Sequence, residues 1–240
     1  MINLFLRSFI FWLYSTVSIV IGGVLCGLSI FLPLRMRFVF IKSFSHAYFA
    51  VLKFTCHIEY QVTGLENVAN TKVAVVLCKH QSTFETFLLP VFFPTPAVVI
   101  KRELLWVPFF GWGMYAAKPI SINRSDKRSA MNQILEQGKA ILRAGRWVAL
   151  FPEGTRIPYG QVGHYRLGGA RLAVEAKVPV IPVAHDAGKV WPRRHFIKRP
   201  GIVHFVIGPP IETIGKTPEE VLAETKTWIE TTIASLSTRH

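Results

Sequence analysis

The chain has 240 residues, a formal net charge of +14 and an apolar fraction of one half. Its length excludes two large domains, and a mean hydropathy of +0.34 exceeds what a typical soluble domain needs, so we expect part of the protein to meet lipid. Three cysteines without a CxxC spacing argue against a disulfide framework or a zinc site.

The first predicted element is an apolar membrane anchor within residues 1–57. This stretch holds no Asp or Glu and is uncharged over residues 8–34, which is long enough to cross a bilayer core of about 30 Å. A cleaved signal peptide is disfavoured because no A-x-A site follows. The pattern fits a single span and equally a half-inserted hairpin, in which Gly22, Gly23 and Gly27 would permit a bend and residues 38–57 would form an amphipathic partner helix.

Basic residues after the apolar stretch predict its orientation. Arg35, Arg37 and Lys42 outweigh Arg7 on the other side. By the positive-inside tendency, this excess leaves residues 58–240 in the cytoplasm.

Residues 58–240 alternate between strand-like and helix-like patterns. Apolar runs predict strands at 58–62, 73–78, 97–100, 119–122, 147–151, 178–183 and 202–207. Helical periodicity predicts helices at 83–92, 127–144, 166–176 and 218–236. Continuously apolar strands are typical of a parallel sheet that helices cover on both faces. The sequence therefore predicts an α/β domain with a central, mostly parallel sheet flanked by helices.

The junction Cys78–Glu85, between the second predicted strand and the helix after it, contains the first candidate site. Histidine, with an ordinary pKa of about 6.5, is suited to take the proton of an alcohol, and a carboxylate on its second nitrogen would fix the tautomer. His80 and Glu85 are spaced to do this, with amides at the helix start as oxyanion donors. Alternatively, Glu85 only closes a capping box with Ser82. Ser82 as a nucleophile lacks the G-x-S-x-G context.

The second candidate site is Phe151–Arg156, which follows another predicted strand. The Arg156 guanidinium is suited to a bidentate contact with phosphate, and the amides of Gly154 and Thr155 would add donors. Alternatively, the segment is only a type I turn between two elements.

Further candidates lie between and after these junctions. Lys101 and Arg124 would add positive charge for a phosphate, or belong to solvated charged segments. The aromatic loop Pro108–Gly113 would line an acyl channel, face the membrane or pack as core. Lys189–Arg199 interleaves cations with aromatics, which suits lipid headgroups and nucleic acid alike, and the anchor favours lipid. No P-loop, Rossmann, HExxH or EF-hand pattern supports nucleotide or metal chemistry.

Taken in order, these blocks resemble the glycerolipid acyltransferase family, and most closely its bacterial members that acylate 1-acyl-glycerol-3-phosphate. The resemblance spans residues 58–210 and rests on His80-x-Ser82-x-x-Glu85, Lys101-x-Glu103-Leu104 with Pro108 and Gly111, Asn123-Arg124, Phe151–Arg156 and Val178–Val183. It implies an α/β layer with a central sheet, preceded in some members by a two-helix N-terminal motif.

The resemblance also implies roles for individual residues. His80 would be the general base and Glu85 its orienting acid. The acceptor and its phosphate would be bound by Lys101, Arg124, Glu153, Gly154, Thr155 and Arg156. No covalent acyl-enzyme is expected, because a thioester is already activated. The family usually has Asp where this chain has Glu85, and the extra methylene would weaken the pair with His80 unless the helix or rotamer adjusts.

The implied reaction moves a fatty acyl group from acyl-CoA or acyl-acyl carrier protein to lysophosphatidic acid, giving phosphatidic acid in phospholipid biosynthesis without a metal or other cofactor. We expect residues 1–57 to anchor the enzyme in a bacterial inner membrane, on anionic lipids, and residues 58–240 to form the cytoplasmic acyltransferase domain, with no nucleic-acid partner. Alternatives are another lysophospholipid or a lyso-aminolipid as acceptor, and a catalytically silent lipid-binding protein of the membrane surface.

Overall fold

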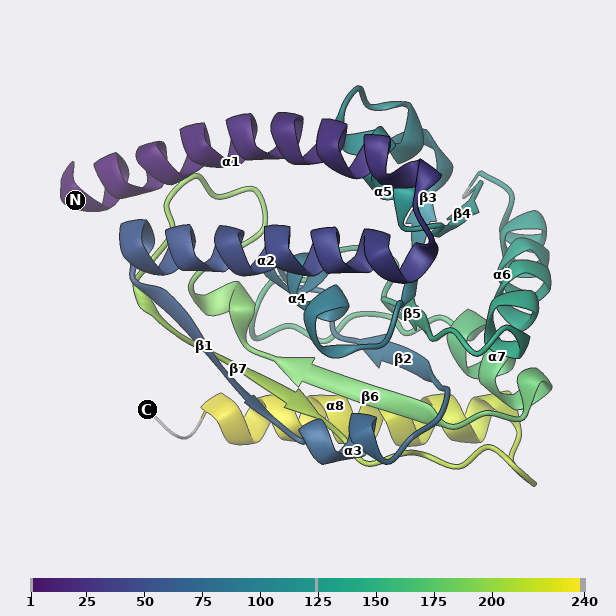
Figure 1. Ribbon diagram of the computed structural model, residues 1–240. Helices are drawn as coiled ribbons and strands as arrows, with labels where there is room; N and C mark the ends of the chain where they lie inside the picture. Colours follow the sequence, from purple (N-terminus) through teal and green to yellow (C-terminus); the bar gives the residue numbers. More distant parts are fainter. Residues whose placement is uncertain (1, 124, 238–240) are drawn as a thin grey trace.

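The computed structural model of the chain describes residues 2–123 and 125–237. Two long helices, α1 (Ile2–Leu28) and α2 (Leu34–Cys56), lie side by side across one face of a sheet (Figure 1). The other helices are α3 (Leu65–Ala69), α4 (Phe84–Phe92), α5 (Phe110–Ala116), α6 (Lys127–Arg143), α7 (Gly168–Ala176) and α8 (Pro218–Ser237). The strands are β1 (Ile58–Thr63), β2 (Val75–Cys78), β3 (Ala97–Lys101), β4 (Ile120–Ile122), β5 (Val148–Leu150), β6 (Val180–His185) and β7 (Gly201–Ile207). Short 3-10 helices lie at Ser29–Phe31, Arg102–Trp106 and Ala187–Lys189.

The sheet has the strand order β1-β7-β6-β2-β5-β3-β4. Strands β6, β2, β5, β3 and β4 are parallel to one another, whereas β7 runs antiparallel to β6 and pairs in parallel with β1. The prediction of a central, mostly parallel sheet flanked by helices is confirmed. Each predicted strand and helix overlaps an observed one, whereas α3 and α5 were not predicted because both are short and lack a clear apolar period.

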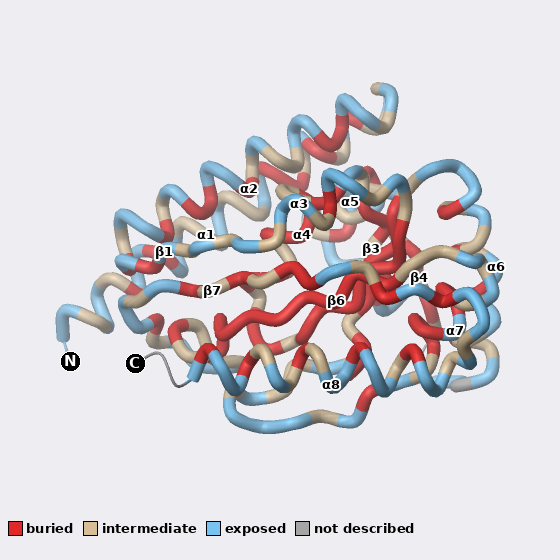
Figure 2. Tube along the Cα trace, turned by 90° about the horizontal axis from the view of Figure 1, so that it is seen from below, coloured by how far each residue is buried: buried red, intermediate tan, exposed pale blue. Residues whose placement is uncertain are grey.

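Successive side chains of the central strands pack against different helical layers. On β2, Val76 and Cys78 join the core cluster that includes residues of α2 and α4, whereas Val75 and Leu77 join the cluster that includes residues of α6 and α7. Strand β6 is buried along its whole length (Figure 2). Because β2, β5 and β3 are parallel neighbours, their carboxyl ends meet at one edge of the sheet and bring together the loops that follow them.

The N-terminal residues form a helical hairpin. Helix α1 runs unbroken through Gly22 and Gly23, so the bend predicted there is wrong, and the chain turns instead at residues 29–33. The glycines allow close packing: a Cβ atom on Gly22 would lie 2.5 Å from the ring of Phe44 on α2, and one on Gly23 would lie 2.2 Å from the carbonyl oxygen of Phe109. Both helices therefore pack closely against each other and against the domain.

The turn between the helices buries Arg37, one of the residues counted for the orientation of the anchor. Its guanidinium donates to the carbonyl oxygens of Leu32 at 2.9 Å and Ala116 at 3.3 Å. These bonds satisfy a carbonyl of the turn between the two helices and one at the end of α5, and they tie the hairpin to the domain.

Helix α1 exposes a large apolar surface. The segment Ile2–Phe31 is long and apolar enough to cross a membrane by length and composition, and only 22% of its most apolar window is buried. Its exposed large apolar side chains are Ile2, Phe5, Leu6, Phe9, Ile10, Trp12, Leu13, Val17, Val20, Ile21, Leu25, Leu28 and Phe31. An apolar surface of this extent suits contact with lipid, so the helix is able to anchor the chain to a membrane.

Candidate active site

His80 and Glu85 meet at the carboxyl end of β2. The Nδ1 atom of His80 lies 2.8 Å from Oε1 of Glu85, whose carboxylate is buried in the first turn of α4. The same oxygen accepts backbone hydrogen bonds from Gln81 and Ser82, both at 2.9 Å. The capping box and the His–Glu pair are therefore compatible, because one carboxylate oxygen makes both sets of contacts.

The environment of Glu85 sets the tautomer of His80. Burial raises the pKa of Glu85, but His185 and the hydrogen bonds from His80 and Ser82 bring that pKa below its ordinary value. The carboxylate is thus an acceptor at neutral pH, Nδ1 of His80 donates to it, and Nε2 has the lone pair that a base needs. Phe151 stacks on the imidazole with ring centroids 4.0 Å apart and restrains its plane.

The segment after β5 holds the main chain of His80 from both sides. The backbone N–H of His80 donates to Oε2 of Glu153 at 2.9 Å, and the N–H of Ile157 donates to the His80 carbonyl oxygen at 2.8 Å. The two candidate sites of the sequence are therefore one structural unit, in which the second positions the histidine of the first.

A buried lysine lies beneath this unit. The Nζ atom of Lys79 is 2.8 Å from Glu153 and 2.8 Å from Glu230 of α8, and Tyr165 donates to Glu230 at 2.8 Å. Lys79 and Glu153 are almost fully buried, so each charge depends on the other for its stability. Sequence reasoning missed Lys79 and Glu230, although a lysine at the end of a continuously apolar strand is itself a sign of a buried partner.

A second histidine packs behind the carboxylate. His185, fully buried at the end of β6, donates from Nε2 to the carbonyl oxygen of Lys79 at 2.8 Å, and the same atom lies 3.8 Å from Oε2 of Glu85. Its Nδ1 lies 3.3 Å from the backbone N–H of Ala187, which donates to it, and this contact helps to fix the orientation of the ring. The sequence pattern did not single out His185, because only the tertiary structure brings β6 beside β2.

Several backbone donors expected to serve a substrate are already bonded. The amides of Gln81 and Ser82 donate to Glu85, and the amide of Phe84 donates to the Ser82 hydroxyl oxygen at 3.3 Å. The amide of Gly154 donates to the carbonyl oxygen of Phe151 at 2.9 Å and closes the turn there. Each of these N–H groups therefore has an internal acceptor, and a role for them in binding a substrate stays a prediction.

The structure separates the six residues expected to bind the acceptor. Lys101 and Arg156 line the same cavity as His80; burial lowers the pKa of Arg156, and Lys101 pairs with Glu103 at 3.2 Å. The carboxylate of Glu153 is engaged beneath His80, and Glu153 lines neither that cavity nor the neighbouring one described below. The other three residues differ in position: Gly154 lines a neighbouring cavity, Thr155 is exposed, and Arg124 lies outside the described residues.

The cavity in front of His80 has a volume of about 430 Å³ and a largely apolar wall. Its lining comes from α1, α2, α4, α5 and β3, and includes Cys26, Phe38, Phe44 and Phe110. The aromatic loop thus contributes to the cavity wall through Phe110, whereas Trp112 is half exposed on the surface. His80, Lys101 and Arg156 supply basic side chains to this largely apolar cavity, an arrangement typical of a site for a ligand with a charged head and an apolar tail.

The basic, aromatic segment Lys189–Arg199 lies against both the site and α1. Arg193 donates to the carbonyl oxygen of Arg156 at 2.8 Å, and the ring of Phe196 lies 5.3 Å from that of Phe5. The segment therefore connects the loop that bears Arg156 to the apolar N-terminal helix. Within the described parts of the chain, no three His, Cys, Asp or Glu side chains are grouped to hold a metal ion.

Comparison with known proteins gives consistent matches. The model of the acyltransferase family matches residues 59–186. The chain is 42% identical over 238 residues to the 1-acyl-sn-glycerol-3-phosphate acyltransferase of Pseudomonas aeruginosa, covering 97% of this chain and 92% of that protein. The mouse 1-acyl-sn-glycerol-3-phosphate acyltransferase alpha is 32% identical over 71% of this chain and 61% of its own length. The crystal structure of the 1-acyl-sn-glycerophosphate acyltransferase PlsC from Thermotoga maritima superposes with a TM-score of 0.81 at 26% identity, over 98% of this chain and 96% of that one.

Proposed function

We propose that this chain, which belongs to the acyltransferase family, transfers a fatty acyl group from a thioester to the free hydroxyl of 1-acyl-sn-glycerol-3-phosphate, giving phosphatidic acid. The observation that supports this reaction most directly is the His80–Glu85 pair, which faces an apolar cavity whose wall also includes Lys101 and Arg156. The names of the relatives support this acceptor.

In the proposed mechanism, His80 is the general base. The acceptor hydroxyl gives its proton to Nε2 as its oxygen attacks the thioester carbonyl carbon and the new C–O bond forms. The tetrahedral intermediate then collapses, the C–S bond breaks, and the proton passes from Nε2 to the departing sulfur. Glu85 stabilises the imidazolium through Nδ1 and keeps Nε2 directed at the substrate.

We propose that the basic and the apolar parts of the cavity bind different parts of the substrates. Lys101 and Arg156 are proposed to bind the acceptor phosphate, together with Arg124, because cations beside an apolar cavity favour a dianionic headgroup. The apolar wall between α1, α2 and α5 would take an alkyl chain. Glu153, by contrast, is proposed to act on His80 through its backbone N–H.

The acyl donor is proposed to be acyl-CoA or acyl-acyl carrier protein, with no cofactor. Residues 1–57 would form the membrane anchor, because α1 exposes apolar side chains along its length. The catalytic domain, residues 58–240, would lie on the cytoplasmic side of a bacterial inner membrane and contact anionic lipids through its basic surface, which suits a chain of net charge +14.

The test is an assay of the full chain in liposomes with labelled palmitoyl-CoA and a panel of lysolipids. Wild type should form phosphatidic acid from 1-acyl-glycerol-3-phosphate, and His80→Ala should lower the rate by about 10² to 10⁴. His46→Ala, a change at a histidine on α2 that lines neither the cavity in front of His80 nor the neighbouring one, is the matched control and should stay active. Near-normal turnover by His80→Ala would refute the base assignment, and a preference for another lysolipid would replace the acceptor.

A further inference from the structure

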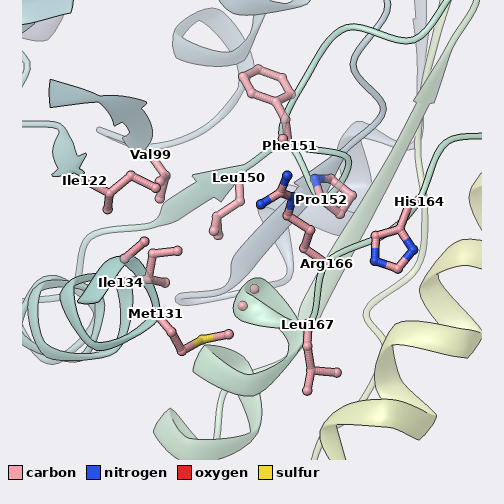
Figure 3. Close-up of a pocket in the computed structure, with 14 residues that line it drawn as sticks. Val99, Ile122, Met131, Ile134, Leu150, Phe151, Pro152, His164, Arg166 and Leu167 are labelled. Carbon is pink, nitrogen blue, oxygen red and sulfur yellow. The ribbon is translucent and has the colours of Figure 1, made fainter. Parts of the chain in front are cut away.

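A second cavity lies on the other face of the sheet from α1 and α2. It has a volume of about 500 Å³ and is enclosed by α6, α7 and the carboxyl ends of β3, β4 and β5. Figure 3 shows its apolar side, formed by Val99, Ile122, Ile134 and Leu150 together with Met131 of α6. Nothing in the proposed mechanism so far uses this space.

The two cavities share lining residues beside the imidazole. Val99 and Phe151 line both cavities, and Phe151 is the residue that stacks on His80. In the second cavity, a ligand that contacts Phe151 is therefore separated from the imidazole of His80 by the ring of Phe151. The two cavities thus approach the reacting centre from opposite faces of the sheet.

Arg166 places a positive charge in the second cavity. Figure 3 shows its side chain extending toward Phe151 and Pro152. Its backbone N–H is held by the Pro152 carbonyl oxygen at 2.8 Å, and Gly154 leaves room for it, because a Cβ atom on Gly154 would lie 3.0 Å from Nε of Arg166. Among the described residues, no carboxylate lies within ion-pair distance of this guanidinium, so its charge is available to a ligand.

We propose that the second cavity binds the phosphopantetheine arm of the acyl thioester, with Arg166 bound to the phosphate of that arm. The inference rests on the proposed function. A thioester has two chains that leave its carbonyl in opposite directions, the acyl tail and the thiol arm, and two cavities that share Phe151, the ring stacked on His80, fit this shape. The arm between sulfur and phosphate is uncharged, which suits an apolar wall with one cation.

The side of approach distinguishes this ligand from the acceptor. Lys101 and Arg156, the cations beside His80 in the first cavity, lie beneath the apolar hairpin, from which a membrane lipid would enter. The second cavity lies beside α6 and α7, away from that hairpin, where a water-soluble donor has access. Coenzyme A and a carrier protein share the same phosphopantetheine arm, so one site serves both donors. In the transfer, the C–S bond breaks beside Phe151, the acyl carbonyl stays with the acceptor oxygen, and the thiol leaves through the second cavity.

The test uses full-length Arg166→Gln with three palmitoyl donors: palmitoyl-CoA, palmitoyl-carrier protein, and palmitoyl-pantetheine, which has no phosphate. The KM for the two phosphate-bearing donors should rise about tenfold, as for loss of one charge-assisted hydrogen bond at a partly exposed site. The KM for palmitoyl-pantetheine and for the lysolipid should not change. Arg171→Gln, a change on α7 outside both cavities, is the matched control.

Two further measurements keep the inference separate from the proposed function. At one fixed concentration, coenzyme A alone should raise the unfolding temperature of wild type and Arg171→Gln more than that of Arg166→Gln, a measurement that needs no turnover. Ala130→Leu, which fills the second cavity, should raise the KM of all three donors. A higher KM for the lysolipid in Arg166→Gln, or an equal rise with palmitoyl-pantetheine, would overturn the inference. Absence of acyl transfer by wild type with every donor would instead overturn the proposed function.

Discussion

The backbone N–H of His80 donates a hydrogen bond to the carboxylate of Glu153 at 2.9 Å. The two residues are 73 positions apart in the chain, and β2 and β5 bring them together as neighbouring parallel strands. Glu153 was expected to bind the acceptor, but it does not line the cavity in front of His80. Instead, its buried carboxylate contacts the backbone of His80 and the ammonium of Lys79. Its effect on a reaction would pass through the position of His80.

Glu153→Gln separates positioning from substrate binding. The amide keeps the shape of the side chain but weakens the acceptor for the His80 N–H and removes one charge beside Lys79. We expect kcat to fall about tenfold with the KM of the lysolipid unchanged, since a barrier increase of about 1.4 kcal/mol corresponds to this factor. Steady-state kinetics in liposomes measure both constants. A higher KM with normal kcat would return Glu153 to the substrate pocket.

Lys79→Met tests the buried charge cluster. Removing the ammonium leaves Glu153 and Glu230 without their shared partner, and breaking a buried pair in this way destabilises a protein by about 3–5 kcal/mol. Chemical unfolding of the full chain in detergent measures the loss. Lys139→Met, which removes an exposed pair with Glu175, should change stability by less than about 1 kcal/mol. Equal effects of the two variants would contradict the assigned role of Lys79.

The contribution of Glu85 to stability should depend on pH. Because its folded-state pKa is below its ordinary value of 4.5, the unfolded chain binds the proton first as pH falls, and protonation favours unfolding. Glu85→Gln should therefore be less stable than wild type at pH 7, and the difference should shrink as pH falls below about 4.5. Unfolding temperatures of both proteins at pH 7, 5, 4 and 3 measure this trend. A difference that is constant over this range would show that the charge of Glu85 is not what stabilises the turn.

Ser45→Leu shortens the apolar cavity. Ser45 is buried on α2 and lines the cavity in front of His80, so the larger side chain takes space that a long acyl chain would fill. Each buried methylene is worth about 0.8 kcal/mol, so kcat/KM for palmitoyl-CoA should fall relative to lauroyl-CoA by at least fourfold. Thr16→Leu, at an exposed position of α1, is the control. An unchanged ratio would place the acyl chain elsewhere.

The sequence predicted the position of the motifs well because their signals are local. The run Val73–Cys78 is apolar throughout and observed as β2 over Val75–Cys78, and the capping-box spacing of Ser82 and Glu85 placed the start of α4. The spacing of His80 and Glu85 also suggested their contact, because five residues across a strand-to-helix turn leave few arrangements. The bend expected at Gly22 and Gly23 was wrong, because the absence of a Cβ atom at these positions allows close packing against Phe44 and Phe109 instead.

What the sequence alone determined is therefore the order of strands and helices, the apolar character of the first helix, and the pair of residues, His80 and Glu85, whose side chains meet. Each of these features is set by residues within a few positions of one another, so apolar periodicity and capping patterns reveal it in the sequence. Only the tertiary structure decided that Glu153 lies beneath His80, that Lys79 pairs with Glu230, and that His185 packs behind Glu85. A buried polar or charged group is stable only with a partner, and here the loop after β5, strand β6 and helix α8 supply those partners from positions more than 70 residues away in the chain.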